Sequence, residues 1–166
     1  QFWEGVVKLN EWHQHRISKL IVKKLFGTVS GKKITILGFA FKANTNDTRE
    51  SPAIKICNDL LEEGAILSIH DPKVSEGQIK KDLKIKFGNI FQEGSCSKSD
   101  DIYESCNGSD AILVLTEWLE YTKIDWQKVS KIIRNPSWVF DARSIIDKDE
   151  VMQAGISFWR VGDGLN

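Results

Sequence analysis

Two cations stand in a polar loop that follows a short apolar segment. Lys42 and Arg49 lie among small polar residues, after the apolar run of residues 34–37. That run is typical of a buried strand, and Ser51-Pro52 is typical of a helix start, with Ser51 as the N-cap and proline at the first helical position. A helix N-terminus and nearby cations both attract anions. The loop therefore has the chemistry of an anion-binding site.

A simpler interpretation is that the loop charges neutralise one another at the surface. The loop has neither the G-x-G-x-x-G spacing of a dinucleotide fingerprint nor the G-K-[ST] ending of a P-loop. On this interpretation Lys42 and Arg49 are solvated, and Asp47 and Glu50 pair with them. The loop taken alone favours this interpretation over a ligand site.

Strand-like and helix-like segments alternate along the rest of the chain. The apolar spacing predicts helices over residues 6–26, 52–63, 101–106, 126–133 and 148–154, and strands over 33–37, 65–70, 111–115, 138–141 and 156–161. Strands separated by helices favour a parallel sheet with right-handed crossovers. The sequence thus predicts an α/β, Rossmann-like three-layer domain with a mostly parallel sheet, preceded by a long connecting helix.

Three loops follow the ends of predicted strands, so parallel strands should bring them to one edge of the sheet. The first holds Phe41, Lys42 and Arg49, the second holds Trp118, and the third holds Arg143. Cations beside aromatic rings are what a nucleotide diphosphate requires, because phosphates bind cations and bases pack on rings. The convergence predicts a nucleotide site at this edge.

Arg143 also has a local explanation. A salt bridge with Asp141 or Asp147, which lie in the same segment, would account for it without any ligand. By itself that explanation is the stronger one, and the convergence of three loops shifts the balance toward a site.

Composition excludes several classes of function. The 166 residues are 41% hydrophobic, enough for one domain with a good core, and the formal net charge is zero. Without bulk positive charge we expect no nucleic-acid partner, and without a long apolar run we expect no membrane association. We expect no metal site, because no cysteine lies at metal-ligand spacing from a histidine. The histidines are His13, His15 and His70.

Three cysteines, an odd number without C-x-x-C spacing, are typical of a reducing compartment, so we expect a cytoplasmic protein. Cys57 falls on the apolar face of a predicted helix and is expected in the core, and Cys106 ends a short helix. Cys96 lies in a polar segment, residues 88–100, interpreted as a surface insertion, and its thiol is expected to be exposed. None of the three is a convincing nucleophile.

The string GFAFKANTNDTRES, residues 38–51, resembles a signature of the nucleotide-sugar dehydrogenases, G-x-x-F-K-x-x-T-x-D-x-R-E-S. It is most similar to the UDP-glucose 6-dehydrogenase branch of that family, where it opens the C-terminal domain. Further segments resemble the family in the same order: Asn10–Arg16, Asp71-Pro72-Lys73, Thr116-Glu117-Trp118 and Phe140-Asp141-Ala142-Arg143. The resemblance therefore covers essentially the whole chain.

The resemblance implies a role for each candidate residue. Phe41, Lys42 and Arg143 match positions that contact the UDP-sugar in the family. Arg49 matches the arginine that reaches across to NAD bound on another domain. By the same analogy, Glu50 and Ser51 shape the loop and its helix. Residues 1–30 would be the tail of the central connecting helix, and residues 31–166 the C-terminal UDP-sugar-binding domain.

The resemblance also implies an activity, namely oxidation of UDP-glucose to UDP-glucuronate with two NAD through a thioester on a catalytic cysteine. The family's catalytic cysteine and NAD fingerprint lie upstream of the segments matched here. A chain that begins at Gln1 and not Met reads as a fragment, which should be inactive alone. Its partners would be the N-terminal NAD-binding and central domains, in a homo-oligomer.

Trp3 and Trp12 would pack on the missing central region or on another subunit, or else cover this domain's own core. Two alternatives for the function stay open. One is a sibling dehydrogenase acting on UDP-N-acetylmannosamine or GDP-mannose, although Thr45–Thr48 and the Thr116-Glu117-Trp118 segment lean toward the UDP-glucose branch. The other is a free-standing nucleotide-sugar-binding module that lacks a catalytic half.

Overall fold

The computed structural model describes residues 2–87 and 94–163. Helices and strands alternate through most of this part of the chain. In order they are α1 (Phe2–Lys24), β1 (Lys33–Leu37), α2 (Pro52–Glu62), β2 (Ile66–His70), α3 (Glu76–Phe87), β3 (Cys96–Lys98), α4 (Ile102–Cys106), β4 (Ala111–Val114), the 3-10 helix η2 (Leu119–Lys123), α5 (Trp126–Ser130), β5 (Trp138–Asp141), α6 (Lys148–Gln153) and β6 (Ser157–Arg160).

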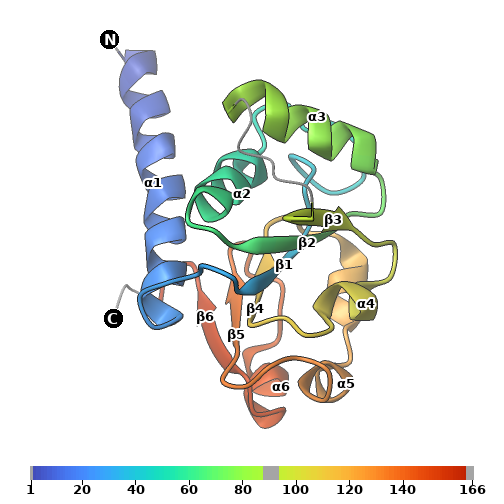
Figure 1. The fold of residues 1–166 in the computed structure, drawn as a ribbon. Helices are drawn as coiled ribbons and strands as arrows, with labels where there is room; N and C mark the ends of the chain where they lie inside the picture. The colour runs from blue at the N-terminus through green and yellow to red at the C-terminus, as the bar shows by residue number, and fades with distance from the viewer. Residues whose placement is uncertain (1, 88–93, 164–166) are drawn as a thin grey trace.

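The six strands form one sheet in the order β3-β2-β1-β4-β5-β6, and all neighbouring strands are parallel (Figure 1). This is the order of a Rossmann fold, and it confirms the predicted fold class. The strand order reverses between β1 and β4, whose registers align Leu37 with Val114. In open α/β sheets, ligands bind outside the carboxyl ends of the strands at such a switch point.

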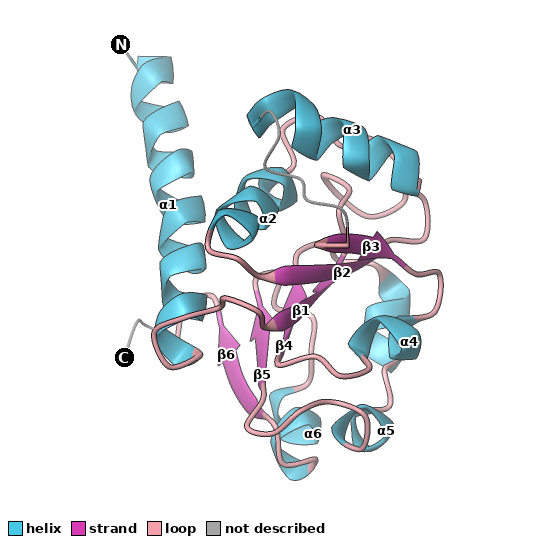
Figure 2. Ribbon diagram, viewed as in Figure 1, coloured by secondary structure: helices cyan, strands magenta, loops and turns pink. Residues whose placement is uncertain are grey.

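Helices cover both faces of the sheet. Figure 2 shows α1, α2 and α3 on one side and α4, α5 and α6 on the other. The strands from β1 to β3 are added along the sheet in one direction, and those from β4 to β6 in the other. Because each crossover is right-handed, the helices of the two halves lie on opposite faces of the sheet. The predicted three-layer arrangement is therefore confirmed.

The central strand β1 is buried along nearly its whole length, as its apolar run predicts. Ile34, Ile36 and Leu37 are fully buried, and each such side chain contributes about 1.5–3 kcal/mol of hydrophobic free energy. Thr35 is buried too, and its hydroxyl donates to the Ser105 carbonyl oxygen at 2.6 Å. That bond satisfies a buried polar group. It also ties β1 to α4, on the face of the sheet that α4, α5 and α6 cover.

The two halves of α1 differ in burial. Near its C-terminal end Leu20 and Ile21 are buried in the core, and Lys24 lies over the Trp138 ring at the start of β5. Toward the N-terminal end Trp3 is 77% exposed and Trp12 is 55% exposed. Of the two alternatives for these tryptophans, the one in which they cover this domain's own core is therefore wrong.

The polar segment at residues 96–98 differs from its sequence interpretation as part of a surface insertion. Residues 96–98 form β3, an edge strand paired in parallel with β2, with Leu67 opposite Cys96. Cys96 is buried, so the expectation of an exposed loop thiol is wrong. The remainder of the expected insertion, residues 88–93, lies outside the described residues. The short polar sequence of β3 carries no strand signal, because its pairing is set by β2.

Candidate functional site

The loop after β1 begins with a close approach between two strand ends. Gly38 has φ +97°, and a Cβ at this position would lie 2.3 Å from Thr116 Cβ. The Thr116 hydroxyl donates to the Ala40 carbonyl oxygen at 2.9 Å. Glycine is thus required where the β1 and β4 loops meet, because any side chain would push them apart.

The same loop ends at a capped helix. Ser51 is the N-cap of α2: its hydroxyl oxygen accepts the Ala53 N–H at 3.3 Å and its proton is donated to the Phe39 carbonyl oxygen at 2.7 Å. Pro52 follows in the first turn, so the predicted helix start is confirmed. The bond to Phe39 closes residues 39–51 into a loop whose two ends are joined.

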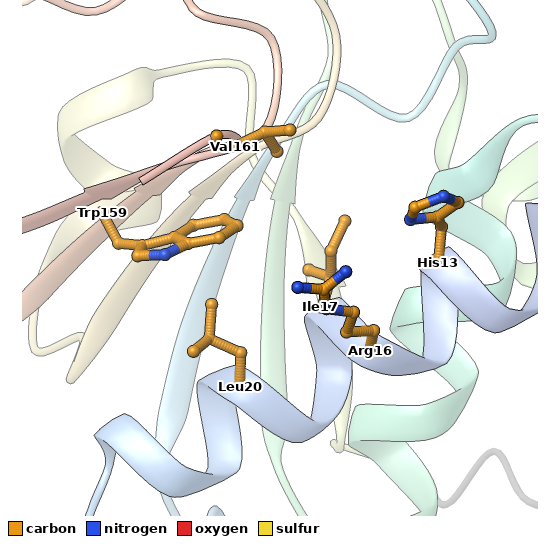
Figure 3. A pocket seen from close by; sticks show the side chains of 7 residues that line it. His13, Arg16, Ile17, Leu20, Trp159 and Val161 are labelled. Carbon is orange, nitrogen blue, oxygen red and sulfur yellow. The ribbon is translucent and has the colours of Figure 1, made fainter. Parts of the chain in front are cut away.

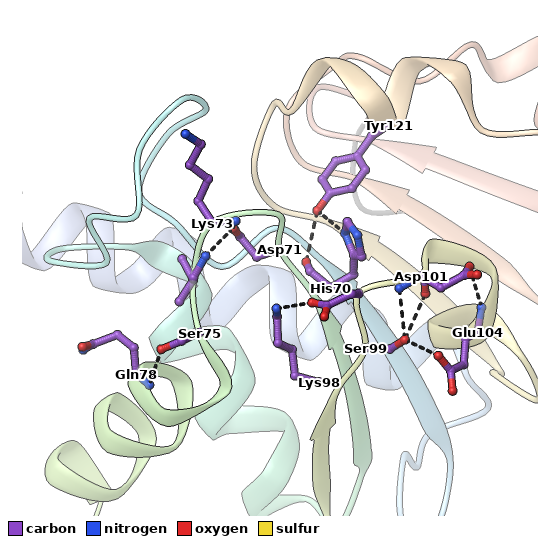
Figure 4. A network of polar contacts seen from close by, with 12 residues as sticks. His70, Asp71, Lys73, Ser75, Gln78, Lys98, Ser99, Asp101, Glu104 and Tyr121 are labelled. Atoms are coloured by element: carbon purple, nitrogen blue, oxygen red, sulfur yellow. Dashed lines mark hydrogen bonds and ion pairs between the residues drawn. The ribbon is translucent and has the colours of Figure 1, made fainter.

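Asp71, directly after β2, holds three loops together from a fully buried position. Its Oδ2 accepts the backbone N–H groups of Phe39 and Ala40 at 2.8 and 3.0 Å and the Trp118 indole N–H at 3.2 Å. Its Oδ1 accepts two more N–H groups from its own turn, including that of Lys73 at 2.9 Å (Figure 4). A carboxylate with five donors is well compensated for its burial.

Asp141, at the end of β5, shapes the third loop in the same way. It is fully buried, and its two oxygens accept the N–H groups of four successive residues, 143–146, at 2.8–2.9 Å. Its carboxylate also lies 3.8 Å from Arg160 Nε. The loop is therefore wrapped around Asp141, and this sets where Arg143 leaves the backbone.

Glu117 joins the first and third loops. Its Oε1 accepts the Ala43 N–H at 2.9 Å, and its Oε2 forms an ion pair with Arg143 Nη2. Burial raises the pKa of this carboxyl, but the N–H groups of Ala43 and Glu117 and the Arg143 charge outweigh it, so the pKa lies below its ordinary value. Glu117 thus links Arg143 to the segment that follows Lys42. Arg143 pairs with Glu117, in contrast to the local aspartate partners considered from the sequence.

Arg49 stays on the outer part of the first loop. Its guanidinium makes two hydrogen bonds to Asp47, at 3.0 and 2.8 Å, and its side chain is 88% exposed. The hydrogen bonds from Arg49 lower the pKa of Asp47 to about 2. The expected pairing of Arg49 with Asp47 is confirmed. Because an exposed ion pair is weak, Arg49 can exchange Asp47 for another anion.

The two aromatic residues expected at the site differ in accessibility. Phe41 is 47% exposed, and Lys42 beside it is also exposed. Within residues 2–87 and 94–163, no hydrogen bond or ion pair holds the Lys42 ammonium group. Trp118 is buried and bonded to Asp71, so the expectation that it offers aromatic surface is wrong.

A second buried pair lies beside Asp71 (Figure 4). His70 Nδ1 and the Tyr121 hydroxyl lie 2.9 Å apart, and that hydroxyl donates to the His70 carbonyl oxygen at 3.1 Å. Burial lowers the pKa of His70, which keeps the ring neutral. His70 is thus a satisfied group, as expected. In the described part of the chain, no cluster of histidines, cysteines and acidic residues has the arrangement of a metal site.

The cysteines do not have the character of nucleophiles. All three are free and buried. Burial raises the pKa of the Cys96 and Cys106 thiols to about 12 and raises that of Cys57 as well. A thiolate is the reactive form, so these side chains are inert at neutral pH.

A separate hollow of about 320 Å³ lies between α1 and the end of β6 (Figure 3). Ile17, Leu20 and Trp159 form apolar walls, and Arg16 and His13 stand on one turn of α1 beside them. The predicted site residues do not line it. Asp71 and Glu117 organise the loops of the predicted site. From the sequence they were named only within segments that resemble the family and were given no role, although each lies just after a buried strand.

Residues 35–148 match the UDP-binding domain of the UDP-glucose/GDP-mannose dehydrogenase family. The chain belongs to this family. It is 38% identical over 178 residues to UDP-glucose 6-dehydrogenase 4 of Oryza sativa subsp. japonica, an alignment that covers 99% of this chain and 37% of the relative. UDP-glucose 6-dehydrogenase 1 of Arabidopsis thaliana is also 38% identical, with the same coverage of both chains. The chain thus spans little more than a third of the length of these relatives.

Two solved structures of nucleotide-sugar dehydrogenases share the fold. A UDP-glucose dehydrogenase from Pyrobaculum islandicum superposes with a TM-score of 0.69 at 23% identity, covering 98% of this chain and 31% of that one. An NDP-N-acetyl-D-galactosaminuronic acid dehydrogenase from Methanosarcina mazei Go1 gives a TM-score of 0.71 at 23% identity, covering 92% and 29%. Within the described residues, no helix combines the length and the apolarity that crossing a bilayer requires.

Proposed function

We propose that this chain is the UDP-sugar-binding part of an NAD-dependent UDP-glucose 6-dehydrogenase, which converts UDP-glucose and two NAD to UDP-glucuronate and two NADH. In this proposal Lys42 and Arg143 bind the diphosphate and Phe41 contacts the UDP-sugar. Arg49 reaches NAD held by another domain. Residues 1–30 are the tail of a connecting helix, and residues 31–166 are the binding domain.

One observation carries the proposal. The family signature lies at the switch point of the sheet, where Glu117 bonds both to Ala43, next to Lys42, and to Arg143. In support of the proposal, two loops about a hundred residues apart in the sequence, each carrying one of the two cations, are joined through Glu117 at the edge where nucleotides bind in such folds. Diphosphate recognition needs this convergence, since one exposed cation alone is strongly solvated.

The residues present do not fit NAD as a dinucleotide-binding Rossmann domain would. Such a domain has a glycine-rich first turn and a free acidic residue after its second strand, which binds the ribose. Here the first loop lacks that fingerprint, and Asp71, the acid after β2, already accepts five hydrogen bonds. NAD would therefore be held mainly by a domain outside this chain, with exposed Arg49 as a contributor.

The nucleophile is also proposed to lie outside this chain, because Cys57, Cys96 and Cys106 are buried with raised pKa values. This chain alone should then bind the sugar nucleotide without oxidising it. Three free thiols support a cytoplasmic protein. Trp3 and Trp12, exposed on α1, support contacts with the central domain or another subunit of a homo-oligomer.

Two measurements test the proposal. Titration of the 166-residue chain with UDP and GDP should show preferential binding of UDP. For the protein at native length, absorbance should report about two NADH per UDP-glucose, and the chain alone should give none. Absence of UDP binding, or NADH production by the chain alone, would contradict the proposal.

The alternative substrates are resolved in the same assay. UDP-N-acetylmannosamine and GDP-mannose are supplied in parallel to the native-length protein. Activity with one of them alone would keep the fold and the diphosphate site and change the sugar. UDP binding by the chain without activity of the native-length protein on any of the three sugars would indicate a binding module.

A further inference from the structure

We propose that Glu117 is a positioning residue for diphosphate binding, which fixes the Arg143 guanidinium beside the Lys42 segment. The inference rests on the proposed function, which assigns the diphosphate to Lys42 and Arg143. Glu117 itself is a carboxylate and would not contact an anionic ligand favourably. Its effect on affinity would pass through the arginine.

The backbone at Glu117 is held on both sides. Thr116 before it is fully buried and bonded to the Ala40 carbonyl oxygen, and Trp118 after it is buried and bonded to Asp71. The carboxylate is fixed in turn by the Ala43 N–H at 2.9 Å. Glu117 therefore presents its second oxygen from a rigid support, as a residue that orients another must.

The Arg143 side chain is less constrained than that of Glu117. The loop around Asp141 fixes its backbone, but its side chain is long and about one third exposed. An arginine loses considerable rotamer entropy on binding a ligand unless another contact already orients it. The ion pair to Glu117 uses Nη2, and the guanidinium has five N–H donors in all. Donors therefore remain for phosphate oxygens while Glu117 holds the group.

Two effects of the Glu117 charge oppose each other. Its negative charge repels a diphosphate, and its contact orients the cation that binds the diphosphate. The paired guanidinium offsets the Glu117 charge at close range, so the remaining repulsion is small, whereas the orienting contact is direct. We therefore expect positioning to outweigh repulsion, and removal of the charge to weaken binding.

Glu117→Gln separates the two contacts of this side chain. The amide oxygen still accepts the Ala43 N–H, but the amide nitrogen is a donor facing the donor groups of Arg143. We expect UDP affinity of the chain to fall about tenfold, with no loss of affinity for uridine, which has no phosphate. In an Arg143→Ala background, Glu117→Gln should cause no further loss, because its effect passes through Arg143.

Asp100→Asn is the matched control. It also removes a carboxylate from an ion pair at the carboxyl edge, that with Lys98, on the β3 side of the sheet. Its UDP affinity should equal that of the wild type. Thermal unfolding of each variant checks the fold, and binding is followed by NMR titration of labelled chain.

Four results would overturn the inference: unchanged or tighter UDP binding by Glu117→Gln, an equal loss of uridine affinity, additivity with Arg143→Ala, or an equal loss of UDP affinity in the Asp100→Asn control. In each case UDP binding by the wild type leaves the proposed function standing. Failure of the wild-type chain to bind UDP overturns the proposed function and this inference with it.

Discussion

The Trp118 indole N–H donates to Asp71 Oδ2 at 3.2 Å and so ties the loop after β4 to the turn after β2. The same oxygen accepts the Phe39 and Ala40 N–H groups from the loop after β1. The loops after three strands, β1, β2 and β4, are therefore joined at one buried carboxylate. Removing the charge should leave several buried donors without a full acceptor.

Asp71→Asn should lower the free energy of unfolding by about 2–4 kcal/mol, because its amide nitrogen would face N–H donors in the core. Urea unfolding of the chain measures the change. Asp101→Asn is the control: Asp101 is the exposed N-cap of α4, and asparagine caps helices as well as aspartate does. A loss below about 0.5 kcal/mol in Asp71→Asn would mean that water satisfies these donors and that Asp71 does not hold the loops.

Lys42→Ala and Arg143→Ala should each weaken UDP binding by about 1–3 kcal/mol, as expected for a charge-assisted contact to phosphate. Isothermal titration of the chain measures both. Lys131→Ala is a suitable control, because Lys131 is an exposed lysine at the C-cap of α5, away from the predicted site. Unchanged affinity in both site variants would return Lys42 and Arg143 to the status of surface cations.

Gly38→Ala should strongly destabilise the chain, by more than about 3 kcal/mol, because its Cβ would overlap Thr116. Gly155→Ala has a similar positive φ, +82°, but nothing lies within 4 Å of its added Cβ. Gly155→Ala should lower the free energy of unfolding by about 1 kcal/mol, because of the backbone conformation alone. The difference in midpoint between the two denaturation curves isolates the close approach. Equal losses would show that the β1 and β4 loops can move apart.

Stability should depend on pH through His70. Burial lowers the pKa of this ring below its unfolded value near 6.5, so the unfolded chain binds the proton more readily than the native chain. Stability is therefore full above pH about 6.5 and falls as the pH decreases below it, by at most about 1.4 kcal/mol per pH unit. Asp47, with a pKa of about 2, acts only at much lower pH.

The His70 effect is measured as the difference in unfolding free energy between pH 7.5 and pH 5.5, in the wild type and in His70→Asn. The asparagine amide N–H can donate a hydrogen bond to the Tyr121 hydroxyl oxygen, but the amide cannot titrate. The change in unfolding free energy between these two pH values should be smaller in His70→Asn than in the wild type. If both proteins lose the same stability between these pH values, His70 does not carry the dependence.

The three thiols should resist alkylation by iodoacetamide in the native chain and react once the chain is unfolded in urea, because burial disfavours their thiolates. Mass spectrometry before and after unfolding counts the labelled cysteines. Rapid labelling of Cys96 in the native state would contradict its burial in β3.

Local patterns were sufficient for much of the architecture. The apolar run at residues 34–37 gave the buried strand β1, and Ser51-Pro52 gave the helix start, because strand burial and capping depend on neighbours in the chain. The strand β3 escaped prediction, since its residues Cys96–Lys98 are held by pairing with β2 and have no alternating apolar pattern. Hydrogen bonds to a distant strand leave no local signal.

The candidate site, too, was only partly predictable from the sequence. By itself the sequence determined the fold class, the family signature and the residue types, including Lys42 and Arg143, because these follow from spacing along the chain. Tertiary structure decided that Arg143 pairs with Glu117 and that Trp118 is buried on Asp71. Those contacts join loops far apart in the sequence, and they arise because six parallel strands in register bring their carboxyl ends to one edge.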